Sequence, residues 1–465
     1  MSEPATEIST SGEAVAEVFA DWATKLAAAE VPDKVRTQMQ SLILDVIGLC
    51  VAARNTDYVA ALLACSDRRG SCTAFGHKRA LGPADAALIN GTAAHGEDYD
   101  DTFEGTPVHA GAVIAPAVLA ACEGFRRSGE DALRGMAVGA ELTCRLALVA
   151  PTAMHRAGFH PTAVIGALGA AAAVSAALGL DRDRMASALG IAGSFASGII
   201  EYLAEGTWTK RIHPGWAAQA GLRAARFAEA GFLGPRTVIE GTHGFFHAFA
   251  DETVPRDYTQ VTDGLGTDWR CERLAFKPYA CGTMAQPFID CAIALRERGV
   301  RAQDVNFMVC KVGEGTVHRL WEPRAEKDAP STPYSAKFSV PYCIAVALID
   351  GAAGLEQFSE ERVADPAVRA LAGKVRYEID PANEYPRNYT GHVRAFLAGG
   401  RSVSTGQPHL RGGWREPLTR PELIAKMEAN LAFGGWPTAR ASEVADFSAT
   451  VLDEDSVAGL AAFRG

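Results

Sequence analysis

Residues 162–180 contain no charged side chain and consist mostly of alanine and glycine. A run of this length approaches that of a membrane-spanning helix, but alanine and glycine gain little free energy on transfer into lipid. Small side chains instead let neighbouring backbones approach closely in a packed interior. The run therefore predicts a buried helix, and together with residues 186–200 it predicts the centre of a helical bundle.

Other helical patterns surround this run. Apolar residues recur at steps of three and four from Val35 to Cys50, which is typical of an amphipathic helix. Short breaks of glycine, proline or aspartate separate further alanine- and leucine-rich segments at 111–122, 131–147 and 216–230. We therefore expect residues 1–267 to form an all-helical domain.

The pattern changes after residue 268. Residues 307–312 are apolar and β-branched, and residues 374–380 alternate with a period of two, as strands do. Two further predicted strands, at 392–398 and 401–404, flank Gly399 and Gly400, which can adopt the positive φ angles of a tight hairpin. Residues 268–405 are thus predicted to form a smaller α+β domain.

Helix is predicted to return near the C-terminus. Thr419 and Glu422 have the spacing of a capping box, and Pro421 suits the first helical turn. Residues 406–465 should therefore rejoin the helical domain. The predicted fold class is mainly α, with a large discontinuous helical domain, 1–267 and 406–465, and one α+β insertion.

Composition excludes several classes of function. With 55 acidic and 45 basic residues the net charge is −10, which argues against binding to nucleic acid or to anionic membranes. The ten cysteines contain no C-x-x-C pair, and no glycine-rich phosphate loop joins a strand to a helix. The first twelve residues are polar and lack an apolar stretch, so we expect a polar tail, no secretory signal and a cytoplasmic protein.

Ionisable residues concentrate in the segment 90–111, NGTAAHGEDYDDTFEGTPVHAG. If Asp98, Asp100 and Asp101 are buried, their mutual repulsion is costly unless cations or hydrogen-bond donors compensate the negative charges. The apolar flanks favour a buried site over an exposed polar loop. His95 precedes Asp98 by three residues, so one helical turn would let this histidine orient the carboxylate. The three aspartates with His95 also admit a magnesium or manganese site, but we predict no metal.

Three later segments each place a cation or an imidazole beside glycine or proline: GFHPT at 158–162, GTWTKRIHPG at 206–215 and FKPYACG at 276–282. In order and wording, these segments and the aspartate segment resemble the MmgE/PrpD family, which includes 2-methylcitrate dehydratase, cis-aconitate decarboxylase and iminodisuccinate epimerase. The resemblance extends to the KFSVPY segment at 337–342.

The resemblance implies a set of site residues, a lid formed by the α+β insertion, a homodimer, and chemistry without a metal or other cofactor. The catalytic residues that it implies are Asp98, His109, His160 and Lys210. The residues that it implies for substrate binding are Thr102, Arg211, His213 and Lys277. The spacer EGTPV before His109 is one residue longer than in decarboxylase-like members.

The roles within this set stay open. Either Asp98 or His160 is the base that removes a proton, and either His109 or Lys210 is the acid. Lysine and arginine side chains would bind carboxylates, Arg211 bidentately. Apart from the resemblance, a histidine before proline more often caps a helix or satisfies a backbone group than it catalyses a reaction.

We therefore predict a metal-independent lyase that acts on a small polycarboxylate by proton abstraction next to a carboxylate. Dehydration of a 2-methylcitrate-like hydroxy acid is the first expectation. A cis-aconitate-type decarboxylase or a dicarboxylate epimerase such as that of iminodisuccinate would use the same site. A non-catalytic binding protein that has kept the fold is the third alternative.

Overall fold

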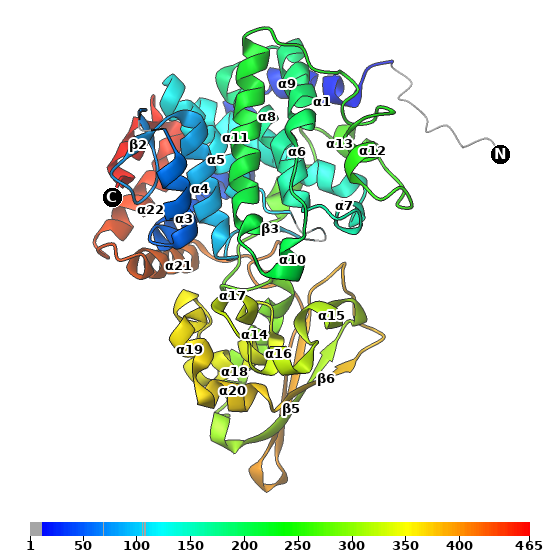
Figure 1. Cartoon of the computed structure of the whole chain (residues 1–465), viewed down its shortest axis with the longest axis vertical. Coiled ribbons are helices and arrows are strands. Elements are labelled where there is room, and N and C mark those ends of the chain that lie inside the picture. The colour runs from blue at the N-terminus through cyan, green and yellow to red at the C-terminus, as the bar shows by residue number, and fades with distance from the viewer. Residues whose placement is uncertain (1–11, 68, 105, 107) are drawn as a thin grey trace, which may run out of the picture.

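A computed structural model describes residues 12–465 except 68, 105 and 107. Most helices gather in one part of the molecule, the helical part, and the four longer strands lie in a second, smaller part (Figure 1). The mainly-α class is therefore confirmed. Residues 1–11 of the predicted polar tail and two residues of the spacer before His109 lie outside the described residues, and the division at residues 268 and 405 stays a prediction.

The helical part contains fifteen α-helices among the described residues: α1 Val15–Lys25, α2 Asp33–Ala53, α3 Asp57–Cys65, α4 Pro83–Gly96, α5 Gly111–Phe125, α6 Gly129–Val149, α7 Ala153–Arg156, α8 Pro161–Leu178, α9 Arg182–Phe195, α10 Tyr202–Glu205, α11 Thr209–Glu229, α12 Phe245–Phe249, α13 Thr259–Thr262, α21 Arg420–Phe433 and α22 Arg440–Thr450. Two short antiparallel pairs accompany them: β1 Cys72–Thr73 with β2 Ala80–Leu81, and β3 Thr102–Phe103 with β4 Leu274–Ala275.

Helix α8 is the centre of this part. Every residue from Pro161 to Leu178 is buried, and α8 packs against α5, α6, α9 and α11. Close approach explains its composition: a Cβ added at Gly221 of α11 would lie 2.4 Å from the Cβ of Ala170. Both α2 and α8 are long and apolar enough to cross a membrane, but most of α2 and all of α8 are buried inside the protein. The predicted buried helix is confirmed.

Two predicted helix boundaries are wrong. Helix α11 begins at Thr209 and not near residue 216, because Pro214 lies inside the helix instead of breaking it. Helix α9 ends at Phe195, so residues 196–200 are not helical. The first difference matters for function, because it places Lys210, Arg211 and His213 on the first turns of a long helix.

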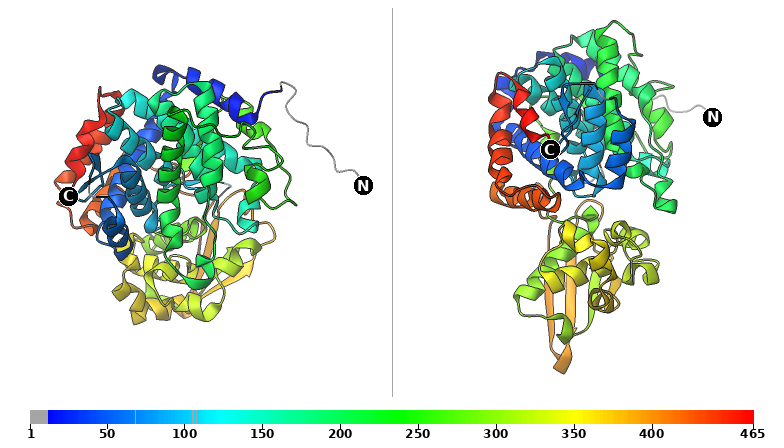
Figure 2. Two further views of the ribbon diagram at one scale, coloured as in Figure 1. Left: turned by 45° about the horizontal axis from the view of Figure 1, so that its top comes forward. Right: turned by 60° about the vertical axis from the view of Figure 1, so that its left-hand side comes forward.

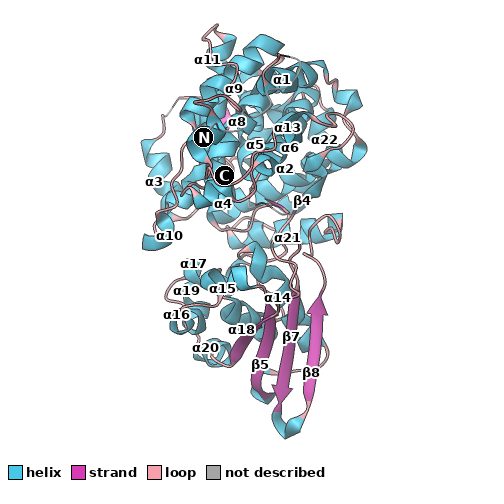
Figure 3. Cartoon of the chain, turned by 90° about the vertical axis from the view of Figure 1, so that its right-hand side faces the viewer, coloured by secondary structure: helices cyan, strands magenta, loops and turns pink. Residues whose placement is uncertain are grey.

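The smaller part combines one sheet with short helices. Its helices are α14 Gln286–Glu297, α15 Val317–Leu320, α16 Arg324–Asp328, α17 Pro333–Ala336, α18 Val340–Asp350, α19 Glu360–Ala364 and α20 Pro366–Ala372. Its strands are β5 Val305–Val312, β6 Val375–Ile379, β7 Gly391–Leu397 and β8 Ser402–Gln407. They form one sheet in the order β6-β5-β7-β8, which extends from the helical part to the far end of the molecule (Figure 3).

Only the β5–β6 pair of this sheet is parallel. Met308, Cys310, Val393 and Ala395 are buried on one face, and α14 and α18 belong to the same core. Between β7 and β8, Gly399 and Gly400 have φ angles of 77° and 81°. The predicted strands and their glycine hairpin are confirmed.

The C-terminal helices return to the helical part, where they lie beside helices from the N-terminal region (Figure 2). Thr419 and Glu422 form the predicted capping box at the start of α21. The buried ion pair between Lys426 Nζ and Asp45 Oδ1, 2.7 Å apart, joins α21 to α2. Lys426 also donates to the backbone oxygen of Tyr99. A helix of the C-terminal segment therefore holds the backbone of the aspartate segment in place.

Candidate active site

Asp98 lies at a sharp turn after α4. Its φ angle is 54°, in the left-handed region that costs a non-glycine residue conformational energy. This turn aims the carboxylate at two lysines: Lys210 Nζ donates to Oδ2 at 2.7 Å, and Lys277 Nζ donates to Oδ1 at 2.6 Å. Lys277 also donates to the Asp98 backbone oxygen at 2.9 Å. The structure thus joins three predicted site residues from well-separated segments.

Electrostatics favour the charged forms in this group. Burial raises the pKa of the Asp98 carboxyl, but the ammonium groups of Lys210 and Lys277 outweigh it and hold the pKa well below its usual range. Burial lowers the pKa of Lys210, and the Asp98 carboxylate outweighs this effect, so that the pKa is raised. Asp98 is therefore a carboxylate at neutral pH, and Lys210 is an ammonium ion.

Asp100 binds two histidines. Its Oδ2 lies 2.7 Å from His95 Nδ1 and 3.3 Å from His109 Nδ1. His109 Nδ1 also lies 2.7 Å from the backbone oxygen of Asp101. Because a carbonyl oxygen only accepts, His109 Nδ1 carries a hydrogen, and in the neutral ring Nε2 carries the lone pair. The expectation that His95 orients Asp98 is wrong, because the turn at Asp98 ends the helical path and brings Asp100 to His95 instead.

Asp101 has a different environment from its neighbours. Its Oδ1 accepts a hydrogen bond from the backbone N–H of Gly111 at the start of α5. Burial, and then the charge of Asp100, raise the pKa of Asp101 to about 7. This carboxyl therefore fixes the entry to α5 and does not meet the lysines.

His160 and His213 form a buried pair. Their Nδ1 atoms lie 3.1 Å apart, and the rings of both histidines contact Tyr202, at centroid distances of 6.3 and 5.8 Å. His160 occupies the cap position of α8, yet its side chain makes no capping hydrogen bond. Burial, followed by the nearby charges, holds the pKa of His160 well below its usual value and lowers that of His213 to about 4. Both rings are neutral at pH 7.

Thr102 is buried in strand β3, where its backbone pairs with Ala275 of β4. This pairing is the reason that Lys277, two residues further on, reaches Asp98. Among the described residues no hydrogen bond is made by the Thr102 hydroxyl, so its predicted role toward substrate stays a prediction.

Arg211 lies against two aromatic rings, and its predicted bidentate contact with a substrate carboxylate stays a prediction. Its guanidinium lies between the rings of Tyr58 and Tyr334, 4.6 and 4.9 Å from their centroids. Tyr58 belongs to the helical part and Tyr334 to the smaller part. Arg211 therefore joins the two parts through its stacked rings.

A second contact between the parts was missed by sequence reasoning. Lys337 Nζ donates to Glu97 Oε2 at 2.9 Å and to the Glu97 backbone oxygen at 2.6 Å. Next to it, Phe338 lies 5.4 Å from Lys210 Nζ. The resemblance at the KFSVPY segment could have drawn attention to Lys337 and Phe338, but no pattern in the sequence indicated that Lys337 would bind Glu97.

The described residues contain one group of side chains that could hold a metal ion: the ligand atoms of His95, Asp100 and His109 lie within 4.8 Å of one another. The metal site considered from the sequence, His95 with the three aspartates, does not form. The two lysines bind Asp98, and the N–H of Gly111 donates to Asp101. In the observed set, both Nδ1 atoms already face Asp100.

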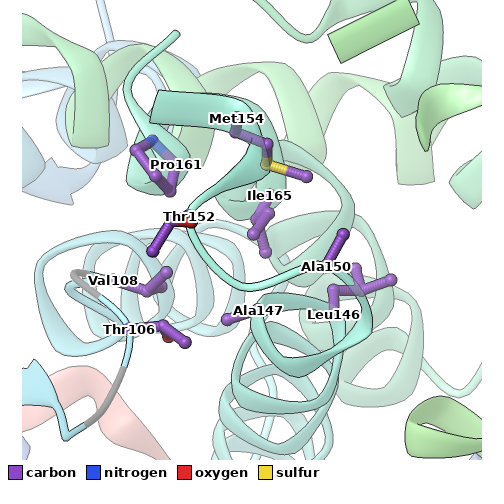
Figure 4. Close-up of a pocket in the computed structure, with 9 residues that line it drawn as sticks. All are labelled: Thr106, Val108, Leu146, Ala147, Ala150, Thr152, Met154, Pro161 and Ile165. Atoms are coloured by element: carbon purple, nitrogen blue, oxygen red, sulfur yellow. The ribbon is translucent and has the colours of Figure 1, made fainter. Parts of the chain in front are cut away.

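A small pocket is lined in part by chain neighbours of two of the histidines (Figure 4). Two of its lining residues, Val108 and Pro161, are chain neighbours of His109 and His160. Its wall is mainly apolar and consists of Thr106, Val108, Leu146, Ala147, Ala150, Thr152, Met154, Pro161 and Ile165. An apolar wall beside His160 favours the neutral form of that imidazole.

Comparison with known proteins gives matches over most of the chain. Residues 17–257 match the MmgE/PrpD N-terminal domain, and residues 279–447 match the MmgE/PrpD C-terminal domain. A cis-aconitate decarboxylase of Aspergillus terreus is 30% identical over 450 residues, which cover 91% of this chain and 90% of that protein. The cis-aconitate decarboxylases of Mus musculus and Homo sapiens are each 29% identical, over 90% of this chain and 86% and 87% of theirs.

Proposed function

Because this chain belongs to the MmgE/PrpD family, we propose that it is a lyase that removes carbon dioxide from cis-aconitate or a closely similar tricarboxylate. The relatives named above support decarboxylation over the dehydration of 2-methylcitrate that the sequence first suggested. The observation that carries the proposal is the pairing of Lys210 and Lys277 on Asp98 beside the neutral His160–His213 pair.

The proposed reaction breaks the bond between a carbon atom and a carboxylate, which leaves as carbon dioxide. The electron pair of that bond forms a new double bond, the old double bond opens, and its far carbon takes a proton. The two ammonium groups stabilise the negative charge that develops on the remaining carboxylates. A neighbouring acid must supply the proton, and Lys210 or His109 takes this role in our proposal.

If a proton must be removed, as in dehydration or epimerisation, His160 is the better base of the two candidates. Both oxygens of Asp98 already accept from lysines, whereas His160 contacts His213 through Nδ1 and keeps Nε2 for another partner. A bound polyanion would also raise the pKa of the neutral imidazole and so favour its protonation.

One experiment separates these activities. Protein dialysed against a chelator is incubated in deuterated buffer with cis-aconitate, 2-methylcitrate, citrate and iminodisuccinate, and the products are followed by proton NMR. We expect carbon dioxide release and a new methylene signal from cis-aconitate. Loss of water from a hydroxy acid, or deuterium exchange alone, would instead assign a dehydratase or an epimerase.

The control variants test whether the site is responsible. Activity should be lost in His160→Ala and Lys210→Ala and kept in His392→Ala and Lys311→Ala, which lie on the outer face of the sheet. Turnover that survives both site variants would contradict the proposal. No change of any substrate would favour the third alternative, a non-catalytic binding protein.

We propose further that the protein is a homodimer. Phe227, Phe232 and Leu233, at and just after the end of α11, are exposed to 43%, 64% and 82% and offer an apolar surface. Light scattering on the purified protein and on a Phe232→Ser, Leu233→Ser variant tests this assignment. The cytoplasmic location and the lack of nucleic-acid and membrane partners stay predictions.

A further inference from the structure

The lysines closest to the aspartate segment already have anionic partners, and Arg211 is held between the rings of Tyr58 and Tyr334. Lys210 and Lys277 both bind Asp98, Lys337 binds Glu97, and Lys426 binds Asp45. A tricarboxylate brings about three negative charges at neutral pH. If the proposed function holds, the site therefore needs a further cation that is not neutralised within the protein.

Arg319 is such a cation. It lies on α15 of the smaller part, and its Nη2 lies 3.4 Å from His155 Nδ1 on α7 of the helical part. Figure 1 shows α15 at the end of the smaller part that faces α7 and α10. Over the described ranges of the chain, no ion pair joins Arg319 to a carboxylate. Burial, and then Arg319 itself, lower the pKa of His155 to about 4, so this partner is neutral and leaves the arginine charge uncompensated.

Tyr202 lies against the His160–His213 pair. Its ring contacts His160 and His213, and burial raises the pKa of its phenol to about 12. The charges of Lys210 and Arg319 both oppose this rise. His155, the residue that Arg319 contacts, follows Met154, and Met154 lines the same pocket as Pro161, the chain neighbour of His160.

We propose that Arg319 binds one carboxylate of the polycarboxylate substrate and so supplies an anchor from the smaller part. The guanidinium has five N–H donors in a planar fork, which fits a carboxylate through two parallel hydrogen bonds. Its contact with His155 uses one side of the fork. Substrate thus lies between the anchor on α15 and the lysines at Asp98, and both parts of the chain bind it.

The test compares Arg319→Gln, Arg319→Lys and the control Arg376→Gln, which removes an exposed arginine from the sheet. Binding of tricarballylate, a saturated tricarboxylate without a reactive double bond, is measured by calorimetry. We expect Arg319→Gln to weaken this binding about 10- to 100-fold, because a charged hydrogen bond is lost. Arg319→Lys should restore part of the affinity, and Arg376→Gln should match the wild type.

Kinetics with cis-aconitate give the second readout. Arg319→Gln should raise KM by a similar factor and change kcat much less, a split that a general loss of structure would not produce. Wild-type affinity and KM in Arg319→Gln would overturn the inference while the proposed function stands. Conversely, Arg319-dependent binding of tricarballylate without turnover of cis-aconitate would overturn only the proposed function. Failure of the wild type both to bind tricarballylate and to turn over cis-aconitate would overturn both.

Discussion

The ion pairs at Asp98 predict a large effect of a nearly isosteric change, Asp98→Asn. Asparagine tolerates the left-handed conformation at this position, so the substitution removes the charge without adding backbone strain. Lys277 is almost fully buried and Lys210 largely so, with side chains 1% and 12% exposed. Removing one partner of a buried ion pair leaves an uncompensated charge and costs about 3–5 kcal/mol.

We therefore expect Asp98→Asn to lower the free energy of unfolding by about 3–5 kcal/mol at pH 7. Urea denaturation followed by circular dichroism measures this value, with an unchanged slope if only stability changes. Asp98→Ala should cost a further 1–2 kcal/mol or so, because alanine does not favour the left-handed region.

The pH dependence gives a second test of the same reasoning. The folded state lowers the pKa of Asp98 below its unfolded value, so the stabilisation is complete above about pH 4 and is lost as the pH falls through the folded pKa. The acid-side loss of stability should be smaller in Asp98→Asn. A variant within 1 kcal/mol or so of the wild type at pH 7 would refute the argument that Asp98 holds two buried ammonium groups.

Three further predictions follow from described contacts. Asp100→Asn should lower kcat by about 100-fold with unchanged circular dichroism, because His95 and His109 lose their charged partner; a change under twofold would contradict this role. Gly221→Ala should destabilise the helical part by about 1–3 kcal/mol by forcing α8 and α11 apart, whereas the exposed Gly373→Ala should not, as urea denaturation would show. Burial lowers the pKa of His95 to about 4, below its unfolded value, so the unfolded state binds more protons as the pH falls below 6.5; His95→Gln should abolish a loss of about 2 kcal/mol between pH 6.5 and 5.

Local patterns in the sequence predicted the elements that depend on local chemistry. The small residues of α8, the capping box at Thr419 and the glycines of the β7–β8 hairpin act within a few residues of their own positions. Such features are set by backbone conformation and by periodicity, and the sequence displays both.

Contacts across the fold could not be predicted in the same way. Glu97 meets Lys337, and Arg319 meets His155, only because the smaller part lies against the helical part. The pairing of His95 with Asp100 depends on the left-handed turn at Asp98, which no spacing rule indicated. The motif residues Asp98, Lys210 and Lys277 do lie together. That each lysine pairs with a different oxygen of Asp98 is visible only in the structure.

The packing of α21 on α2 has a consequence for biosynthesis. Gly48 of α2 lies so close to Met427 that an added Cβ would be 3.1 Å from Met427 Cγ, and Lys426 closes the ion pair with Asp45. At typical translation rates the ribosome needs roughly 20 to 80 s to make the intervening chain. During that time the apolar face of α2 has no permanent cover, so the nascent protein depends on transient protection, by chaperones or by its own earlier helices, until its last helices emerge.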